Sequence, residues 1–324
     1  MSSASANGPE LAAWLAARGL LPLQIRPLPG DVGPRRYYRL ELAGGATALL
    51  AVYPADLVAT CRRFLATTEL LAAAGVRVPA VVAHACDRGW TVVEDLGVTT
   101  LYDLAGRPWN ELVPFYRSAV EAIDRIAALL PAAVAELSPP LDAALLRREL
   151  AQTWDELLAP RGLTGEPALA AALARALDAL CADLAAPPPV PCHRDLMARN
   201  LVPLADAAVG VLDHQDLRLG PPLYDLALLL NDSLFPLPEV EAAILAGVLG
   251  GEEDLWRYRR AAAQRTLKAA GTFAAFARRG SDRHLGLIPP TLARASAQLS
   301  ALPETAELGR ELARLWRPVT EPIC

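Results

Sequence analysis

One short stretch constrains this chain more than any other: Cys192-His193-Arg194-Asp195-Leu196-Met197-Ala198-Arg199-Asn200, followed by Val211-Leu212-Asp213. It places an aspartate, an asparagine five residues later, and a second aspartate after an apolar segment. Apolar residues flank the stretch on both sides, so its polar residues fall on loops between short strands. A carboxylate that accepts a hydroxyl proton, with two oxygen ligands for Mg²⁺, is the set that phosphoryl transfer from ATP requires. The pattern therefore predicts Asp195 as the base and Asn200 and Asp213 as metal ligands.

The order His-Arg-Asp, then Asn, then Asp resembles the catalytic and metal loops of the protein-kinase-like superfamily. No Asp-Phe-Gly or Ala-Pro-Glu follows, which disfavours a protein kinase with a long activation loop. Instead, a short loop leads from Asp213 to Tyr224-Asp225-Leu226-Ala227. That arrangement resembles the aminoglycoside phosphotransferase family of small-molecule kinases. The resemblance implies an α+β, protein-kinase-like fold with two lobes, and ATP and Mg²⁺ as cofactors.

Within that family the chain is most similar to the bacterial kinases of cell-wall recycling. Three further stretches carry this similarity, namely residues 30–39, 61–65 and 264–273. It implies an ATP-dependent sugar kinase that phosphorylates the anomeric C1 hydroxyl of N-acetylmuramate and N-acetylglucosamine, in peptidoglycan recycling. The alternatives are an aminoglycoside kinase, a kinase of the choline or homoserine type, and a kinase-like binding protein without activity.

The residue pattern predicts a small β-rich lobe followed by a larger, mostly helical lobe. Helices are expected at 9–18 and 57–74, and strands at 25–28, 37–42, 46–53, 78–83 and 90–94, which form a five-stranded antiparallel sheet. Almost everything after residue 99 is expected to be helical, apart from the catalytic hairpins. We therefore expect a nucleotide-binding lobe over 1–96 and a catalytic and acceptor-binding lobe over 97–324, hinged near Glu94-Asp95-Leu96-Gly97.

Two segments of the first lobe are expected to contact the nucleotide. Gly30 and Gly33 lie between the first two strands, where backbone amides freed by glycine can approach phosphate oxygens. A plain hairpin turn is the alternative for this segment. By the resemblance, backbone groups of Glu94 and Leu96 hydrogen-bond adenine.

The lysine that kinases usually carry on the third strand is missing here, because Val52-Tyr53 occupies its place. Arg35, Arg36 and Arg39 follow the glycine segment, and on a strand Arg36 faces away from the other two. One of them could supply the missing charge to the phosphates, with Arg36 slightly favoured. A solvated edge strand is the alternative for each.

The acceptor side holds further candidates. Arg199 could neutralise phosphoryl charge as a catalytic residue or form a structural ion pair, and Asp216 could bind a sugar hydroxyl. Asp225 is expected to cap its helix and brace the catalytic loop. The segment 256–283 is rich in cations, and Lys268 in it is a candidate for binding an acceptor carboxylate. Such a segment suits an anionic sugar better than a polycationic aminoglycoside.

Composition narrows the class of protein. Of the 31 basic residues 30 are arginine, which reflects coding bias and indicates no function by itself. A net charge of −5 argues against nucleic acid as a partner, and no apolar run reaches the roughly 18 residues that a membrane span needs. Five cysteines without C-x-x-C spacing and no visible secretory signal predict reduced thiols in the cytoplasm. No obligate protein partner is evident from the sequence.

Overall fold

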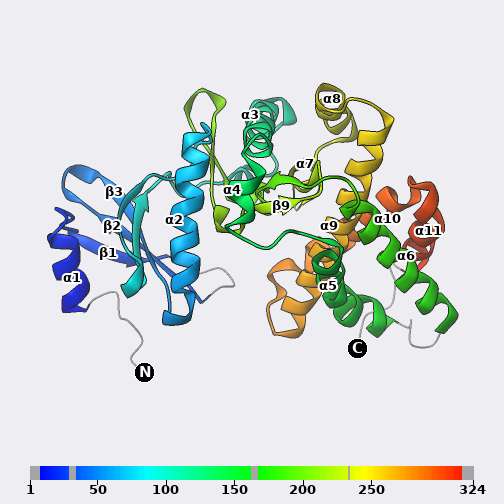
Figure 1. Cartoon of the computed structure of the whole chain (residues 1–324), viewed down its shortest axis with the longest axis horizontal. Coiled ribbons are helices and arrows are strands. Elements are labelled where there is room, and N and C mark those ends of the chain that lie inside the picture. Colours follow the sequence, from blue (N-terminus) through cyan, green and yellow to red (C-terminus); the bar gives the residue numbers. More distant parts are fainter. Residues whose placement is uncertain (1–7, 29–33, 162–166, 233, 316–324) are drawn as a thin grey trace. The chain divides into compact units, whose positions relative to one another are not determined.

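The computed structural model describes residues 8–28, 34–161, 167–232 and 234–315, and the chain divides into two compact units (Figure 1). The first unit comprises residues 1–99 with 202–215, and the second comprises 100–201 with 216–324. The predicted division at 96/97 lies three residues from the first of these boundaries. The segment 202–215, which carries Asp213, groups with the first unit instead of the second.

Backbone contacts explain why the segment 202–215 joins the first unit. It contains β8 (Val209–Val211), and the amide of Val211 donates to the carbonyl of Arg77 at 2.7 Å. Gly210 allows a close approach, because a Cβ at that position would lie 2.5 Å from Cδ1 of Leu96. The local pattern around Asp213 contains no sign of these contacts, since their partners lie more than a hundred residues earlier.

The first unit is built on a five-stranded antiparallel sheet in the order β1-β2-β3-β5-β4, which confirms the prediction. Its strands are β1 (Gln24–Pro27), β2 (Arg36–Glu41), β3 (Thr47–Val52), β4 (Val81–Ala85) and β5 (Trp90–Glu94). Two helices accompany it, α1 (Pro9–Ala16) and α2 (Val58–Ala73). A short hairpin, β7 (Leu201–Pro203) with β8, completes the unit.

Alternating side chains give the sheet one helix on each face. Leu50 of β3 packs in a core with Leu11 and Trp14 of α1. Its neighbour Ala51 belongs to a second core, which includes Cys61 of α2. Successive residues of a strand point to opposite faces, so the same short strand serves both cores.

The expectation of reduced thiols is wrong for two of the five cysteines. Cys61 on α2 and Cys86, just after β4, form a disulfide with a Cα–Cα distance of 5.7 Å. They are 25 residues apart in sequence, so local spacing carried no sign of the pair. Cys181 and Cys192 are buried free thiols, and Cys324 lies outside the described residues.

The second unit is mostly helical, as predicted. Its helices are α3 (Trp109–Ala127), α4 (Pro131–Ala135), α5 (Ala143–Thr153), α6 (Pro167–Ala185), α7 (Tyr224–Asn231), α8 (Pro238–Val248), α9 (Glu252–Arg278), α10 (Ile288–Ser300) and α11 (Ala306–Leu315). A two-stranded antiparallel sheet of β6 (Val190–Cys192) and β9 (Arg218–Gly220) flanks the catalytic stretch. Among the described residues, no helix has both the length and the apolar character that crossing a membrane requires.

The long helix α9 organises the second unit by packing against α5, α7 and α10 (Figure 1). Small residues allow the approach of α5. A Cβ at Gly271 would lie 2.5 Å from the Cα of Thr153, whose hydroxyl donates to the Leu267 carbonyl at 2.9 Å. Asp142 starts α5 by accepting a hydrogen bond from the Leu145 amide. This packing holds α5 and α9, which both contribute to the site described below.

Candidate active site

The catalytic loop follows β6 and is fixed by a carboxylate from α7. Asp225 accepts hydrogen bonds from the amides of His193 (2.6 Å) and Arg194 (2.8 Å). Arg194 has φ of 74°, a left-handed conformation that a non-glycine residue adopts only when its surroundings impose it. The predicted bracing role of Asp225 is confirmed, whereas its own helix has no side-chain cap and begins after Leu223.

Asp195 is a partly buried carboxylate among cations. Its side chain is 26% exposed, and Nη2 of Arg265 lies 3.7 Å from its Oδ1. Burial raises the pKa of Asp195, but the opposing fields of Arg265, Lys268 and Arg194 outweigh burial and lower it below the usual value. Asp195 is therefore ionised at neutral pH, as a group that orients and accepts a hydroxyl proton must be.

Asn200 ends the loop with its side-chain amide held in place. Its Nδ2 donates to the backbone carbonyl of Asp195 at 2.8 Å, and its backbone amide donates to Met197 at 2.8 Å. The NH₂ end is thus committed to the loop, and Oδ1 is the end suited to a cation. The loop therefore links the position of the candidate base to that of the candidate metal ligand.

Arg199 contacts an aromatic ring. Its guanidinium carbon lies 3.5 Å from the centroid of Tyr102, which stands in the turn Leu101–Leu104. Hydrogen bonds from Thr100, and to a smaller extent the charge of Arg199, lower the pKa of Asp103 in the same turn. Arg199 is therefore anchored beside Asn200, an arrangement that suits the structural alternative and leaves its catalytic role a prediction.

Asp216 lies in an ion-pair cluster. It accepts from Nη1 of Arg194 at 2.5 Å, and Nη2 of Arg218 lies 3.3 Å from its other oxygen. The second Arg194 nitrogen pairs with Glu149 of α5. Two arginines thus surround the carboxylate that the sequence suggested for a sugar hydroxyl.

Lys268 reaches the same cluster from α9. Its Nζ lies 3.0 Å from Oε1 of Glu149, the oxygen that also pairs with Arg194. Burial and the neighbouring Arg265 lower the pKa of Lys268 to about 8, against the attraction of Glu149. The only lysine of the chain is thus close to the candidate base, which its field also stabilises as an anion.

Sequence reasoning missed two residues of this cluster. Glu149 was not singled out, because it lies on an ordinary amphipathic helix, 46 residues before Asp195 in the sequence. Arg265 was noted only as part of the stretch 264–273, which resembles the cell-wall recycling kinases, and of the cation-rich segment 256–283. A useful signal was its position three residues before Lys268, which places both on one side of a helix.

Asp213 has its own surroundings in the first unit. It adopts φ of 59°, and its Oδ1 accepts from Nε2 of Gln215 at 2.8 Å and from Nη2 of Arg35 at 3.1 Å. Its side chain is 40% exposed, so the carboxylate is open to a ligand. Arg35 also lies near the rings of Tyr37 and Tyr53, 5.7 and 6.0 Å from their centroids.

The three candidate arginines of the first unit have different surroundings. Arg35 contacts Asp213, whereas Arg39 forms a two-fold pair with buried Asp95, at 2.6 and 3.2 Å. Arg36 is exposed on β2. The geometry therefore favours Arg35 over Arg36 as the cation that accompanies the phosphates.

The remaining nucleotide residues are placed as follows. Gly30 and Gly33 lie outside the described residues. The backbone amide of Glu94 donates to the backbone carbonyl of Ala80 at 2.8 Å. Of the two backbone groups of Glu94, the carbonyl is therefore the candidate for a hydrogen bond to adenine. Leu96 packs against Gly210.

His214 connects the metal-ligand segment to α2. Its Nε2 lies 2.7 Å from the hydroxyl of Thr68, and its ring stacks on Phe64 with a centroid distance of 4.7 Å. Both partners lie on α2, and His214 is fully buried. The residue next to Asp213 is therefore anchored to a helix, which limits the freedom of the carboxylate.

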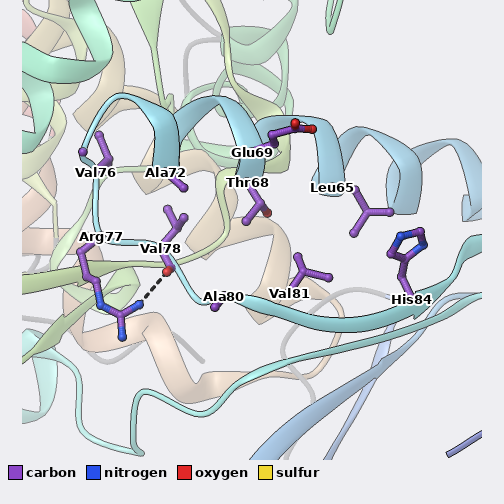
Figure 2. Close-up of a pocket in the computed structure, with 11 residues that line it drawn as sticks. Leu65, Thr68, Glu69, Ala72, Val76, Arg77, Val78, Ala80, Val81 and His84 are labelled. Carbon is purple, nitrogen blue, oxygen red and sulfur yellow. Dashed lines mark hydrogen bonds between the residues drawn. The ribbon is translucent and has the colours of Figure 1, made fainter. Parts of the chain in front are cut away.

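A cavity of about 670 Å³ lies beside Thr68, between α2 and β4. Figure 2 shows Leu65 and Thr68 of α2 above Val81 and His84 of the β4 strand. Its lining is mostly aliphatic and includes none of the predicted site residues. It is therefore separate from the candidate site.

Each predicted metal ligand offers an oxygen of the kind that magnesium binds. Among the described residues, no group of three or more His, Cys, Asp or Glu side chains is arranged to hold a metal ion. Mg²⁺ needs no such cage, because it binds through one or two protein oxygens together with phosphates and water. Asn200 and Asp213 provide oxygens of that kind.

Comparison with known proteins identifies the family. The family model described as the phosphotransferase enzyme family (APH) matches residues 24–263. The chain belongs to this family. It is therefore a phosphotransferase, and the predicted relationship is confirmed.

Curated relatives cover most of the phosphotransferase. The N-acetylmuramate/N-acetylglucosamine kinase of Pseudomonas aeruginosa is 34% identical over 309 residues, which cover 91% of this chain and 89% of the relative. A kinase of the same name from Neisseria meningitidis is 30% identical over 275 residues, 80% of each chain.

Solved structures confirm the fold. ADP-bound aminoglycoside phosphotransferase APH(2'')-Ib superposes with a TM-score of 0.61 at 14% identity, over 95% of this chain and 99% of that one. Choline kinase LicA from Streptococcus pneumoniae gives 0.62 at 14% identity, over 89% and 98%. The phosphotransferase thus has the expected protein-kinase-like fold.

Proposed function

We propose that this phosphotransferase transfers the γ-phosphate of ATP to the anomeric C1 hydroxyl of N-acetylmuramate and N-acetylglucosamine, in the cytoplasm, as a step of peptidoglycan recycling. The name shared by its curated relatives supports the two sugars. The observation that carries the choice is the charge beside the base: Nη2 of Arg265 lies 3.7 Å from Asp195, and the charge of Lys268 also acts on that carboxylate.

Asp195 acts as the base in this proposal. The ionised carboxylate accepts a hydrogen bond from the C1 hydroxyl and orients its oxygen. It takes the proton as the C1 oxygen bonds to the γ-phosphorus and the bond from that phosphorus to the bridging oxygen of ADP breaks, which releases ADP. An anomeric hydroxyl is more acidic than an ordinary alcohol, so a carboxylate with a lowered pKa is a sufficient base. Arg265 and Lys268 keep it ionised.

Asn200, through Oδ1, and Asp213 would hold Mg²⁺, and Arg35 would accompany the phosphates. When bound, the metal neutralises charge on the phosphate oxygens. Arg35 replaces the missing strand lysine, because it is the candidate arginine that already contacts Asp213. Arg199 supports the loop from Tyr102.

An aminoglycoside acceptor is the alternative, and the charge of the site disfavours it. Aminoglycosides carry several ammonium groups, which two cations beside Asp195 would repel. Similar solved aminoglycoside phosphotransferases share 14–22% identity with this chain, so they support the fold and not the acceptor.

A panel of acceptors tests the proposed function. ATP consumption is measured with N-acetylmuramate, N-acetylglucosamine, kanamycin, choline and homoserine, each with an Asp195→Asn control. Turnover of the two sugars alone is expected. Faster turnover of kanamycin or choline than of either sugar would exclude the proposal.

A further inference from the structure

Arg265 is a buried cation whose hydrogen-bonding capacity is largely unused. Its side chain is only 5% exposed, and Nη2 faces Asp195 at 3.7 Å. Nε and Nη1 have no hydrogen-bond acceptor among the described residues. A buried donor without an acceptor is costly, so an arriving anion that supplies the acceptor would bind favourably there.

The other cations of the cluster already form short ion pairs with carboxylates. Arg194 and Lys268 share Glu149, and Arg194 also pairs with Asp216. Arg265 faces Tyr224, whose ring centroid lies 5.8 Å from the guanidinium carbon, and Asp195, whose oxygen is farther away than in a normal hydrogen bond. The cluster therefore has spare positive charge at Arg265, directly beside the candidate base.

Composition singles out Lys268 as well. In a chain that uses arginine at 30 of 31 basic positions, the one lysine stands in this cluster. Arginine is evidently tolerated wherever a surface cation is enough. A compact ammonium that offers three donors in a small space differs in kind from a planar guanidinium. Glu149 uses one of those donors.

We propose that Arg265 and Lys268 together bind the carboxylate of an anionic acceptor and determine its preference over a neutral one. They stand three residues apart on α9, so both reach the same side of the helix. The guanidinium donates to the carboxylate, while the ammonium adds a second charge-assisted hydrogen bond. This inference rests on the proposed function, since N-acetylmuramate differs from N-acetylglucosamine by an ether-linked lactyl group that carries such a carboxylate.

The pair also answers an electrostatic difficulty. An acceptor carboxylate brought close to ionised Asp195 would be repelled by it. Cations placed beside the base offset that repulsion, and a neutral acceptor has no such need. Arg265 is thus a specificity-determining residue as well as a neighbour of the base.

The test compares two acceptors that differ only in the lactyl group. In Arg265→Gln, kcat/KM for N-acetylmuramate should fall about tenfold to a hundredfold further than kcat/KM for N-acetylglucosamine, the range expected for a hydrogen bond to a charged group. Arg265→Lys, which keeps the charge, should recover part of the preference. Lys268→Gln should shift the same ratio in the same direction.

Arg257→Gln is the matched control on the same helix. Arg257 pairs with Glu253 and Asp254 and is 33% exposed, so its loss should leave the ratio unchanged. An equal loss for both sugars in Arg265→Gln would overturn the proposal, because a residue that acts only through Asp195 affects both alike. Wild-type protein that phosphorylates neither sugar would instead refute the proposed function.

A measurement on the unaltered protein covers the case in which Arg265→Gln does not fold. The carboxamide of N-acetylmuramate keeps the shape of the lactyl group and removes its charge. Wild-type kcat/KM should be at least about tenfold lower for the amide than for the acid. Equal values for amide and acid would overturn the proposal without any substitution.

Discussion

Asp195 and Asp213 are the residues on which turnover should depend most. Each carries a charge at a loop, and neither forms part of a core. Asp195→Asn and Asp213→Asn should each lower kcat by at least about a hundredfold, the usual scale for a positioned base or charge stabiliser. Circular dichroism should show an unchanged fold. Near-normal turnover in either variant would remove that residue from its role.

The lowered pKa of Lys268, about 8, predicts a pH dependence of acceptor preference. Lysine is a cation below its pKa, so the attraction for a carboxylate is present at pH 7 and lost as pH rises through 8. The ratio of kcat/KM for N-acetylmuramate to that for N-acetylglucosamine should therefore fall between pH 7 and pH 9. Taking the ratio cancels effects on the base and on ATP.

The groups that face Lys268 do not titrate in this window. Glu149 of α5 and Asp195 of the catalytic loop have lowered pKa values, and Arg194 and Arg265 have raised ones. In Lys268→Arg the ratio should be flat over the same range, because arginine stays charged. A ratio that falls equally in wild type and Lys268→Arg would point to another group.

Arg35 should matter for ATP. Because it contacts Asp213, Arg35→Gln should raise KM for ATP by about tenfold, on the scale of one charge-assisted contact. Arg36→Gln tests the earlier preference for that residue, and Arg26→Gln, on exposed β1, is the neutral control. A larger effect from Arg36 than from Arg35 would contradict the assignment.

At the scale of elements, the contact between α5 and α9 is the most sensitive to change. Gly271→Ala would place a methyl group 2.5 Å from the Cα of Thr153, so the helices must separate. We expect a loss of about 1–3 kcal/mol in the free energy of unfolding, measured with urea, and some loss of activity, since these helices carry Glu149 and Arg265.

Gly247→Ala on α8 is the matched control. A Cβ there would meet nothing within 4 Å, and alanine favours a helix over glycine by roughly 0.5–1 kcal/mol. The free energy of unfolding should therefore stay the same or rise. Equal losses from the two substitutions would show that the α5–α9 contact is not tight.

Local pattern predicted the elements well, because the forces that set them are local. Alternation of apolar and polar residues predicted β2, β3 and β5 to within one or two residues at each end. The run of polar residues between two apolar segments likewise predicted that Asp195 and Asn200 lie on a tight loop. Strand β4 begins three residues later than expected, after Val78-Pro79-Ala80. Proline removes a backbone donor there, which delays pairing.

Long-range contacts could not be predicted from the sequence. Glu149 meets Lys268 from a helix 119 positions away, and Cys61 meets Cys86 across α2 and the end of β4. No periodicity or characteristic spacing in the sequence marks either pair, because only the fold brings its two members together. The role of Arg265 could not be predicted either, because it depends on two guanidinium nitrogens, Nε and Nη1, that have no hydrogen-bond acceptor among the described residues.

At the scale of the whole molecule, net charge is a poor guide to the site. The chain carries a formal charge of −5, yet cations gather around Asp195 in the second unit. Overall charge excludes classes of partner, such as nucleic acid, whereas the choice of acceptor depends on a few buried groups. The phosphotransferase can therefore be acidic overall and still favour an anionic sugar.

The position of the new phosphate tests the central claim most directly. N-acetylmuramate and N-acetylglucosamine are each incubated with the protein, ATP and Mg²⁺, and the products are examined by ¹H–³¹P correlation NMR. The account predicts phosphorus coupled to H1 of each sugar, and no product with Asp195→Asn. Phosphorus coupled to H6, or no phosphorylated sugar from wild-type protein, would contradict it.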